Sequence, residues 1–409
     1  MNLKVINEEK FLKFANSNPL NSFYESLEWY HLKQKEGKKC ELVGLFKGKK
    51  LVGVSIIIYI KILRKFYMAY SSRGFLYDYK KNAEFTDALK KYFNNNVVFF
   101  RMDPPIVMVS YDKDMQKCEF EESISLINDL KRNGFKHYGF NTDFKTMQFR
   151  FVNKLSIEES FEKQLLNMNK STKKNIELAI SKGVRIKRVD YQDFDKVYNL
   201  FENTIERKNI DGFSKEFYES LINEFKDNIV MYLTYIDKKE YISNLEKKLD
   251  DAKNSIFEIN KKMEHDNVGA KLKKQLEDAK KTKEKILQEL KEAEALEDRT
   301  YIASMLSIFM YDEAVSFVSG MDNKYRAFCP KYAMYPELIK EAKSKQKKYV
   351  NFLGVKNIFD KNDSAYGVFE VKRGFGGHTL EYIGEFDLPF NKILYIIYKI
   401  KENKERGKL

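Results

Sequence analysis

A dense run of basic residues lies near the middle of the chain, over residues 170–188. Its basic members are Lys170, Lys173, Lys174, Lys182, Arg185, Lys187 and Arg188. The apolar positions between them follow a helical spacing, which predicts an amphipathic helix with a basic outer face. Nucleic-acid phosphates or the anionic inner leaflet of a membrane are the partners that suit such a face. An ordinary solvated, lysine-rich surface is the alternative.

The charge of the whole chain points to the same class of partner. The sequence has 74 Lys and Arg against 60 Asp and Glu, which gives a formal net charge of +14. A surplus of this size favours anionic ligands such as nucleic acid, a phosphorylated substrate or a membrane surface. The hydrophobic content of 43% and the aromatic content of 14% argue against disorder, and the 409 residues predict two or three domains.

The residue types that build metal centres and disulfides are scattered. The three cysteines, Cys40, Cys118 and Cys329, form no CxxC pair, and the four histidines are equally dispersed. We therefore expect no metal site and no disulfide framework, and a reducing cytoplasm fits this usage. The N-terminus lacks the pattern of a signal peptide. The longest apolar run, "LVGVSIIIYIKIL" (51–63), is shorter than a membrane span and predicts a buried strand.

Two heptad patterns flank the turn-forming stretch "EHDNVGAK" (264–271). Apolar residues alternate at spacings of three and four from Ile242 to Met263 and again from Leu272 to Ala293, with Lys283 as a charged intruder. This predicts an antiparallel coiled-coil hairpin over 239–298, with helices about 30–35 Å long. Residues 238–299 contain 16 basic and 15 acidic side chains, so a charge of +13 lies outside the hairpin. An arm that grips a polyanion along its length should be more basic, so oligomerisation or rigidity is the alternative to a contact with RNA.

Both halves of the chain predict the same order of elements: a helix pair, a strand–turn–strand, then a helix and another strand. In the first half the expected elements are helices 8–16 and 24–35, strands 41–47, 51–63 and 66–71, helix 83–94 and strand 96–103. In the second half they are strand 147–153, helix 158–182, strand 184–189, helices 191–208 and 214–226, strands 229–236, 300–309 and 313–320, helix 331–345 and strand 349–354.

This order indicates an α/β protein made of two copies of one unit, similar to the N-acetyltransferase (GNAT-like) fold, with the hairpin inserted in the second copy. The expected boundaries are 1–145 for the first unit and 146–392 for the second. A C-terminal helix and basic tail are expected over 390–409.

The C-terminal stretch "VKRGFGGHTLEYIGEFDLPFNKILYIIYK" (371–399) resembles the end of the FemABX family. The agreement extends along nearly the whole chain, through "SLEWYHLK" (26–33), "SSRGFLYD" (71–78), "FRMDPP" (100–105), "KSTKKNIELAISKGV" (170–184), "IERKNI" (205–210) and "SGMDNKYRAFCPKYAMYPELIKEA" (319–342). Members of this family add amino acids to peptidoglycan precursors. The resemblance implies two acetyltransferase-like domains, and it accounts for the hairpin as an insertion that many members carry.

The reaction that the resemblance implies is the aminolysis of an ester. Aminoacyl-tRNA is the donor, and the acceptor is the stem-peptide amine of a UDP-linked or lipid-linked muramoyl pentapeptide. The resemblance implies no metal and no cofactor. We expect a cytoplasmic location. Two possibilities stay open: a peripheral contact with the inner membrane leaflet, and a homo- or hetero-oligomer.

The resemblance assigns substrate contacts to three residues. Lys33 matches a family lysine that grips the phosphates of the precursor, and Arg207 matches an arginine at the same site. Phe317 stands where some members have a tyrosine, so we expect an acceptor pocket of different shape. The alternatives are a solvated Lys33 and an Arg207 that pairs with Glu202 or Glu206.

The resemblance to the FemABX family also implies catalytic roles for two further residues. Lys372 matches a lysine near the reacting carbonyl, where a fixed ammonium would stabilise the tetrahedral oxyanion. Asp103 lies where a catalytic base has been proposed, and an attacking ε-amine with a pKa near 10.4 would benefit from a proton acceptor. In the alternative, Asp103 caps a turn or orders Arg101, and the ribose hydroxyl of the substrate takes the proton. The glycines after Lys372 would let backbone approach a ligand, or they form a turn.

Two other classes of protein stay open. A coenzyme A-dependent N-acyltransferase needs a Gly-rich pyrophosphate loop at a helix N-terminus, whereas "GMDNKYRAFCPKYA" (320–333) has a single glycine. A non-enzymatic coiled-coil assembly protein would leave Lys33, Asp103, Arg207 and Lys372 without a role. Transfer of an amino acid from charged tRNA, and the sensitivity of that transfer to RNase, separates the three classes.

Overall fold

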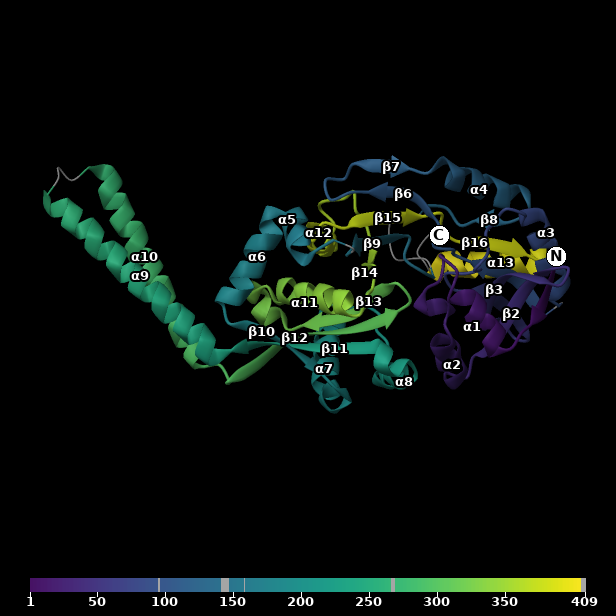
Figure 1. Ribbon diagram of the computed structural model, residues 1–409, viewed down its shortest axis with the longest axis horizontal. Helices are drawn as coiled ribbons and strands as arrows, with labels where there is room; N and C mark the ends of the chain where they lie inside the picture. The colour runs from purple at the N-terminus through teal and green to yellow at the C-terminus, as the bar shows by residue number, and fades with distance from the viewer. Residues whose placement is uncertain (95, 141–146, 158, 266–268, 406–409) are drawn as a thin grey trace.

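The computed structural model of the protein describes residues 1–409 except 95, 141–146, 158, 266–268 and 406–409. The chain forms two mixed sheets that lie side by side in one elongated body, and a pair of long helices projects from one end of it (Figure 1). The fold is therefore a mixed α/β fold, as the sequence predicts.

Within the residues that the structure describes, sheet A has seven strands. In their order across the sheet they are β1 (Asn2–Val5), β2 (Lys39–Lys47), β3 (Lys50–Leu63), β4 (Phe66–Ser71), β5 (Val97–Met102), β16 (Phe386–Pro389) and β8 (Lys136–His137). In the described part of the chain, sheet B has nine strands, in the order β10 (Val184–Val189), β11 (Ile229–Asp237), β12 (Arg299–Met310), β13 (Glu313–Met321), β14 (Tyr349–Val355), β9 (Phe151–Ser156), β15 (His378–Tyr382), β6 (Val107–Tyr111) and β7 (Lys117–Glu119).

The two sheets repeat one pairing pattern. In sheet A, β2, β3 and β4 pair antiparallel, and β4 then pairs parallel with β5 after helix α3 (Asn82–Tyr92). In sheet B, β11, β12 and β13 pair antiparallel, and β13 pairs parallel with β14 after helix α11 (Pro330–Ser344). Each parallel pair is followed by an antiparallel neighbour, β16 in sheet A and β9 in sheet B.

The sheets do not follow the order of the sequence. Strands β6 and β7, which precede residue 145, join sheet B through β15. The late strand β16 joins sheet A between β5 and β8, and helix α13 (Lys392–Glu405) then contacts β5. The expected boundaries at 145 and 390 stay predictions, and each sheet takes strands from both sides of residue 145.

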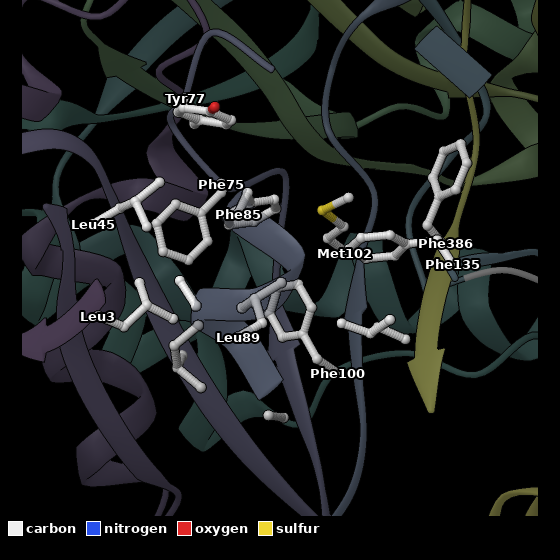
Figure 2. Packing of buried hydrophobic residues seen from close by; sticks show 14 of the residues in the cluster. Leu3, Leu45, Phe75, Tyr77, Phe85, Leu89, Phe100, Met102, Phe135 and Phe386 are labelled. Atoms are coloured by element: carbon white, nitrogen blue, oxygen red, sulfur yellow. The ribbon is translucent and has the colours of Figure 1, made fainter. Parts of the chain in front are cut away.

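Helices cover both faces of sheet A. One face carries α3 and α4 (Glu121–Arg132), and the other carries α1 (Glu8–Ala15) and α13. Figure 2 shows the cluster under α3, where Phe386 of the C-terminal strand lies against Phe135, with ring centroids 6.5 Å apart. Burial of an aromatic or aliphatic side chain of this size contributes about 1.5–3 kcal/mol, so this cluster ties the last strand to the first half.

Sheet B is also covered on both faces. Helices α7 (Phe194–Lys208) and α8 (Lys215–Phe225) pack on one face, and α5 (Phe161–Asn167), α6 (Lys170–Ser181) and α11 pack on the other. Helix α12 (Tyr366–Gly374) follows β14. Helix α2 (Leu27–Lys35) of the first half packs on α8, and its Trp29 and Leu32 share a core with Phe225. The short 3-10 turns are η1 (Phe23–Glu25), η2 (Tyr191–Asp193), η3 (Lys226–Asn228) and η4 (Asn323–Phe328).

Most of the elements expected from the sequence are present, with one clear difference. The helix expected over 158–182 is two helices, α5 and α6, because Met168 and Asn169 are extended. Met168 lies in the core under α11, and the amide of Asn169 donates to the carbonyl of Gly374, 2.9 Å away. These long-range contacts override the continuous helical pattern. Among the described residues, the elements that were not expected from the sequence are β1, β6, β7, α4, β8, α12, β15 and β16.

The projecting pair consists of α9 (Lys238–His265) and α10 (Ala270–Glu294), inserted between β11 and β12. The helices contain 28 and 25 residues, about 42 and 38 Å at 1.5 Å per residue, so they are longer than expected. Near the body, Tyr241, Leu245 and Ile286 are buried in a core that continues into α6 and β10. The turn expected at 264–271 falls partly outside the described residues.

Within the described residues, none of the helices combines the length and the apolar content that crossing a bilayer requires.

Candidate active site

A cavity of about 500 Å³ opens where the two halves meet. Its wall combines α2, β3 and β4 from the first half with α7, α8, β13 and β14 from the second. Aromatic and aliphatic side chains dominate the lining, and a few polar groups lie among them, which is the usual make-up of a ligand pocket. The lining residues used below are Lys33, Glu36, Ile60, Tyr70, Phe213, Phe317 and Leu353.

Helix α2 brings Lys33 to this cavity. The helix begins at Ser26, whose hydroxyl accepts a hydrogen bond from the amide of Trp29 at 3.2 Å. The Lys33 ammonium lies 4.2 Å from the centroid of the Trp29 ring and 2.7 Å from Oε2 of Glu36. Burial lowers the pKa of Lys33, and Glu36 opposes this effect. An anion that enters the cavity would compete with Glu36 for this ammonium.

Phe317 of β13 lines the same cavity. Its ring packs edge-on against Phe23 at 5.8 Å between centroids and stacks on Phe213 at 6.3 Å. The loop that carries Phe213 follows α7, which ends at Asn209 with a left-handed φ of 46°. A Cβ at Gly212 would lie 2.3 Å from the Ile205 side chain, so glycine allows this loop to fold back against α7.

Asp103 lies one side chain behind the cavity wall. Its Oδ2 accepts a hydrogen bond from the Tyr70 hydroxyl at 2.7 Å, and its Oδ1 accepts from the backbone amide of Arg73 at 2.7 Å. Burial raises the pKa of Asp103 to about 7, and the guanidinium of Arg73 opposes the rise. Tyr70 itself lines the cavity, so its hydroxyl connects the carboxylate with the interior.

The structure contradicts the alternative in which Asp103 orders Arg101. Arg101 is fully buried and pairs instead with Asp387, through Nε at 2.6 Å, and with Glu402, through Nη1 at 2.6 Å. The residue that Asp103 holds is Arg73, through its backbone.

Lys372 lies in the last turn of α12 and is buried. Its Nζ donates to the carbonyl of Gly354 at 2.8 Å, next to Leu353, which lines the cavity. Burial, together with the nearby charges of Lys331 and Lys208, lowers the pKa of Lys372 to about 7. The Lys372 ammonium therefore lies near other cations, on the side of the cavity that the second half of the chain forms.

Lys331, at the start of α11, belongs to the same group of cations. Burial lowers the pKa of Lys331 to about 8, and Lys208 and Arg207 contribute in the same direction. Partial desolvation and the charges of Arg207 and Lys356 lower the pKa of Lys208. Among the described residues, Arg207, Lys208 and Lys331 form no ion pair with a carboxylate. The four side chains Arg207, Lys208, Lys331 and Lys372, here called the cation cluster, thus repel one another.

Arg207 does not line the cavity that contains Lys33. It is exposed in the last turn of α7 and lines a separate shallow hollow with Asn203, Glu206 and Asp322. Within the part of the chain that the structure describes, Arg207 forms no ion pair with Glu202 or Glu206, so the alternative role that pairs it with these acids lacks support.

The basic segment 170–188 is only partly available for anions. Three of its side chains, all on β10, already face acids: Arg185 pairs with Glu240, Lys187 with Asp193 at 3.1 Å, and Arg188 with Glu341 at 2.6 Å. The α6 portion, with Lys170 and Lys174 exposed, is the part that keeps a basic surface.

The glycines after Lys372 serve internal packing. A Cβ at Gly374 would lie 2.2 Å from Oγ1 of Thr172, and a Cβ at Gly377 would lie 2.8 Å from the carbonyl of Lys154. Gly376 has a φ of 91°, which favours glycine. The close approach that these residues permit is therefore to α6 and β9 of the protein itself.

Four residues that sequence reasoning left without a role lie at this site: Tyr70, Arg73, Lys208 and Lys331. Arg73, Lys208 and Lys331 fall inside the segments 71–78, 205–210 and 319–342 that carry the family resemblance. Their position inside these segments was the available signal. No local pattern marks Tyr70, because its role depends on Asp103, which directly follows the neighbouring strand β5.

Comparison with known proteins agrees with this arrangement. The model of the FemAB family matches residues 6–403. Aminoacyltransferase FemA from Staphylococcus aureus strain bovine RF122 / ET3-1 is 25% identical over 411 residues, covering 97% of this chain and 98% of FemA. FemA of strain N315 gives the same figures. A crystal structure of FemX superposes with a TM-score of 0.73 at 22% identity, over 97% of this chain and 99% of FemX. The chain belongs to the FemAB family.

Proposed function

We propose that this aminoacyltransferase moves an amino acid from aminoacyl-tRNA to the stem-peptide amine of a peptidoglycan precursor, a UDP-linked or lipid-linked muramoyl pentapeptide. The observation that carries the proposal is the cation cluster beside the cavity that contains Lys33. Cations that lie close together without carboxylate partners are stabilised when an anion binds among them. The phosphates at the acceptor end of a tRNA supply such an anion.

In the proposed reaction the neutral amine attacks the ester carbonyl of the donor. The new C–N bond forms, the carbonyl oxygen becomes an oxyanion, and collapse breaks the C–O bond to the ribose, whose oxygen finally takes up the proton that the amine releases. The Lys372 ammonium stabilises the oxyanion, because its charge matters most where negative charge develops. An anionic donor bound in the cation cluster would raise the pKa of Lys372 and so keep it protonated.

The proton released by the amine has a route to Asp103. The Tyr70 hydroxyl can accept it from the cavity side while passing its own proton to Oδ2 of Asp103, 2.7 Å away. With a pKa raised to about 7, Asp103 is ionised above neutral pH and is well matched to accept a proton there. Asp103 and Tyr70 then act together as a base, rather than Asp103 by direct contact with the amine.

The acceptor would occupy the aromatic cavity. Its phosphates would contact Lys33, and its sugar and peptide would lie against Phe317 and Phe213. Arg207 lines a separate hollow, so a contact with it requires a ligand that extends across the C-terminal end of α7. The absence of a hydroxyl at position 317 leaves the pocket apolar at that point.

We also propose that the fold consists of two acetyltransferase-like units and that α9 and α10 form a coiled coil. The repeated pairing pattern, β2 to β5 and β11 to β14, supports two acetyltransferase-like units. The half-buried seam of α9 and α10, Lys283 included, supports a coiled coil. A peripheral membrane contact and a homo- or hetero-oligomer are further proposals.

One observation disfavours the coenzyme A-dependent alternative. The loop before α11 is closed by η4, where the carboxylate of Asp322 accepts a hydrogen bond from the amide of Lys324 at 2.9 Å. The amide of Lys324 is therefore already paired with a carboxylate and is not free to bind a pyrophosphate.

The test is transfer of a radiolabelled amino acid from charged tRNA to a purified muramoyl-pentapeptide precursor. We expect a labelled product that RNase treatment of the donor abolishes and that coenzyme A thioesters do not support. The Lys372→Met variant should lose this product, and Lys361→Met, at an exposed lysine, should keep it. Transfer from a thioester, or no transfer with any charged tRNA, would overturn the proposal.

A further inference from the structure

The C-terminal helix α13 presents an apolar stripe to solvent. Four isoleucines form it, with exposed fractions of 73% for Ile393, 57% for Ile396, 49% for Ile397 and 50% for Ile400. Their spacing of i, i+3, i+4 and i+7 places them on one face, within about 100° of the helix circumference. Exposed isoleucines gathered in this way are a surface that water does not favour.

The opposite face of α13 already holds the helix on sheet A. Leu394, Tyr395 and Tyr398 pack against the cluster of β4 and β5, with both tyrosine rings 5.2 Å from Phe99. Glu402 accepts from the buried guanidinium of Arg101 at 2.6 Å. The isoleucine stripe (Ile393, Ile396, Ile397 and Ile400) is therefore not needed to attach the helix.

Lysines border the isoleucine stripe. Lys392 and Lys401 are exposed on its two sides, and exposed Lys404 extends it by one turn. An apolar stripe bordered by lysines is the pattern of a helix that lies in the plane of an anionic membrane surface. Each lysine near such a surface adds attraction for anionic headgroups.

We propose that α13 binds the surface of an anionic lipid bilayer, with the isoleucine stripe in the headgroup–acyl boundary and Lys392, Lys401 and Lys404 at the headgroups. A protein partner fits the stripe less well, because interface centres favour Tyr, Trp and Arg and are depleted in Lys. The stripe has neither an aromatic residue nor an arginine, and it lies on a convex helix rather than in a groove.

This site is distinct from the basic segment 170–188. There, Arg185, Lys187 and Arg188 are already paired with acids, whereas α13 has four exposed isoleucines along one face. Docking through α13 would also hold the cavity near the bilayer, since Ile60 and Tyr70 take part both in the cluster under α13 and in the cavity wall.

The experiment is co-sedimentation of the full chain with vesicles of phosphatidylglycerol and phosphatidylcholine, compared with vesicles of phosphatidylcholine alone. We expect binding to the anionic vesicles that weakens as salt rises. The Ile396→Ser/Ile400→Ser variant should bind them at least about tenfold more weakly, because it removes apolar area from the contact. The matched control is Leu178→Ser/Ile180→Ser on α6, where Ile180 has an exposed fraction of 49%.

Loss of binding in the α6 variant with no change in the α13 variant would overturn the proposal. So would a concentration-dependent dimer that becomes monomeric in Ile396→Ser/Ile400→Ser without any vesicle binding, since the stripe would then pair with a second copy.

If the double variant fails to fold, the fluorescence of the Ile397→Trp variant tests the same contact. Its emission should shift to the blue on anionic vesicles, and an unchanged spectrum would refute docking; Trp29, the single native tryptophan, is buried and gives the baseline. None of these readouts depends on amino-acid transfer.

Discussion

Replacement of Lys372 by methionine should stabilise the folded protein and at the same time remove its activity. In the wild type, burial and two neighbouring cations lower the pKa of this ammonium from 10.5 to about 7. A side chain whose charged form is disfavoured in the folded state destabilises that state at every pH where the unfolded chain is protonated. Methionine has a similar length and carries no charge.

The size of the effect follows from the two pKa values. One pKa unit corresponds to about 1.36 kcal/mol, so the drop to about 7 represents about 5 kcal/mol of penalty on the charged form. The substitution also leaves the carbonyl of Gly354 without the hydrogen bond from Nζ, which costs about 1–3 kcal/mol. The net expectation is a gain of about 2–4 kcal/mol in the free energy of unfolding at pH 6.5.

The destabilisation by Lys372 depends on pH. Below pH 7, Lys372 is charged in both states and the folded state bears the whole penalty. As the pH rises from 7 towards 10.5, the folded side chain is neutral while the unfolded one is still charged, so wild-type stability increases. At pH 9.5 only about 1.4 kcal/mol of the penalty remains, and the advantage of the variant should disappear.

The assay is urea unfolding of wild type and Lys372→Met at pH 6.5 and 9.5, with Lys361→Met as a surface control that should stay within about 0.5 kcal/mol of wild type. In the transfer assay, turnover of Lys372→Met should fall about 10²–10³-fold with little change in precursor affinity. A variant that is less stable than wild type at pH 6.5, or a difference that does not change with pH, would refute the reasoning about the buried charge.

Three further substitutions test the rest of the site and the arm. Asp103→Asn should lower transfer about 10²-fold and remove the acid limb near pH 7 from the profile of kcat/KM, and an unchanged profile would mean that the substrate or water takes the proton. Lys33→Met and Arg207→Met should mainly raise the KM for the precursor, more strongly at low salt, where charges are least screened; a fall in kcat alone would speak against substrate binding. Replacement of residues 250–282 by a short glycine-containing turn should leave a cooperatively folded body by circular dichroism, because Tyr241, Leu245, Ile286 and Ala293, which are buried at the base of the arm, are retained. Loss of the cooperative transition would contradict an inserted hairpin.

Several parts of the fold could be predicted because they depend on local periodicity. The heptad spacing from Ile242 to Met263 and from Leu272 to Ala293 is enough to specify two helices with one apolar seam. Runs such as 184–189 and 349–354 are strands in the structure because their β-branched and aromatic residues suit a pleated surface. The segments that resemble the family could likewise be read without coordinates.

Other parts were decided by contacts between residues far apart in the chain. The pattern over 158–182 is helical throughout, yet Met168 enters the core and Asn169 donates to Gly374, so the helix divides there. Strand β16 could not be assigned to sheet A from its own sequence, because its neighbours β5 and β8 lie more than 240 residues earlier.

The sequence by itself determined the helices and strands of the repeated pattern, the hairpin and the family, because these depend on neighbouring residues and on motifs. Only the tertiary structure decided what surrounds each charged group. Lys372 lies beside Lys331, Asp103 is hydrogen-bonded to Tyr70, and Arg101 is paired with Asp387 and Glu402. A pKa, a hydrogen bond and the exposure of the isoleucines of α13 all depend on which distant segments pack against a residue, and that is a property of the folded chain.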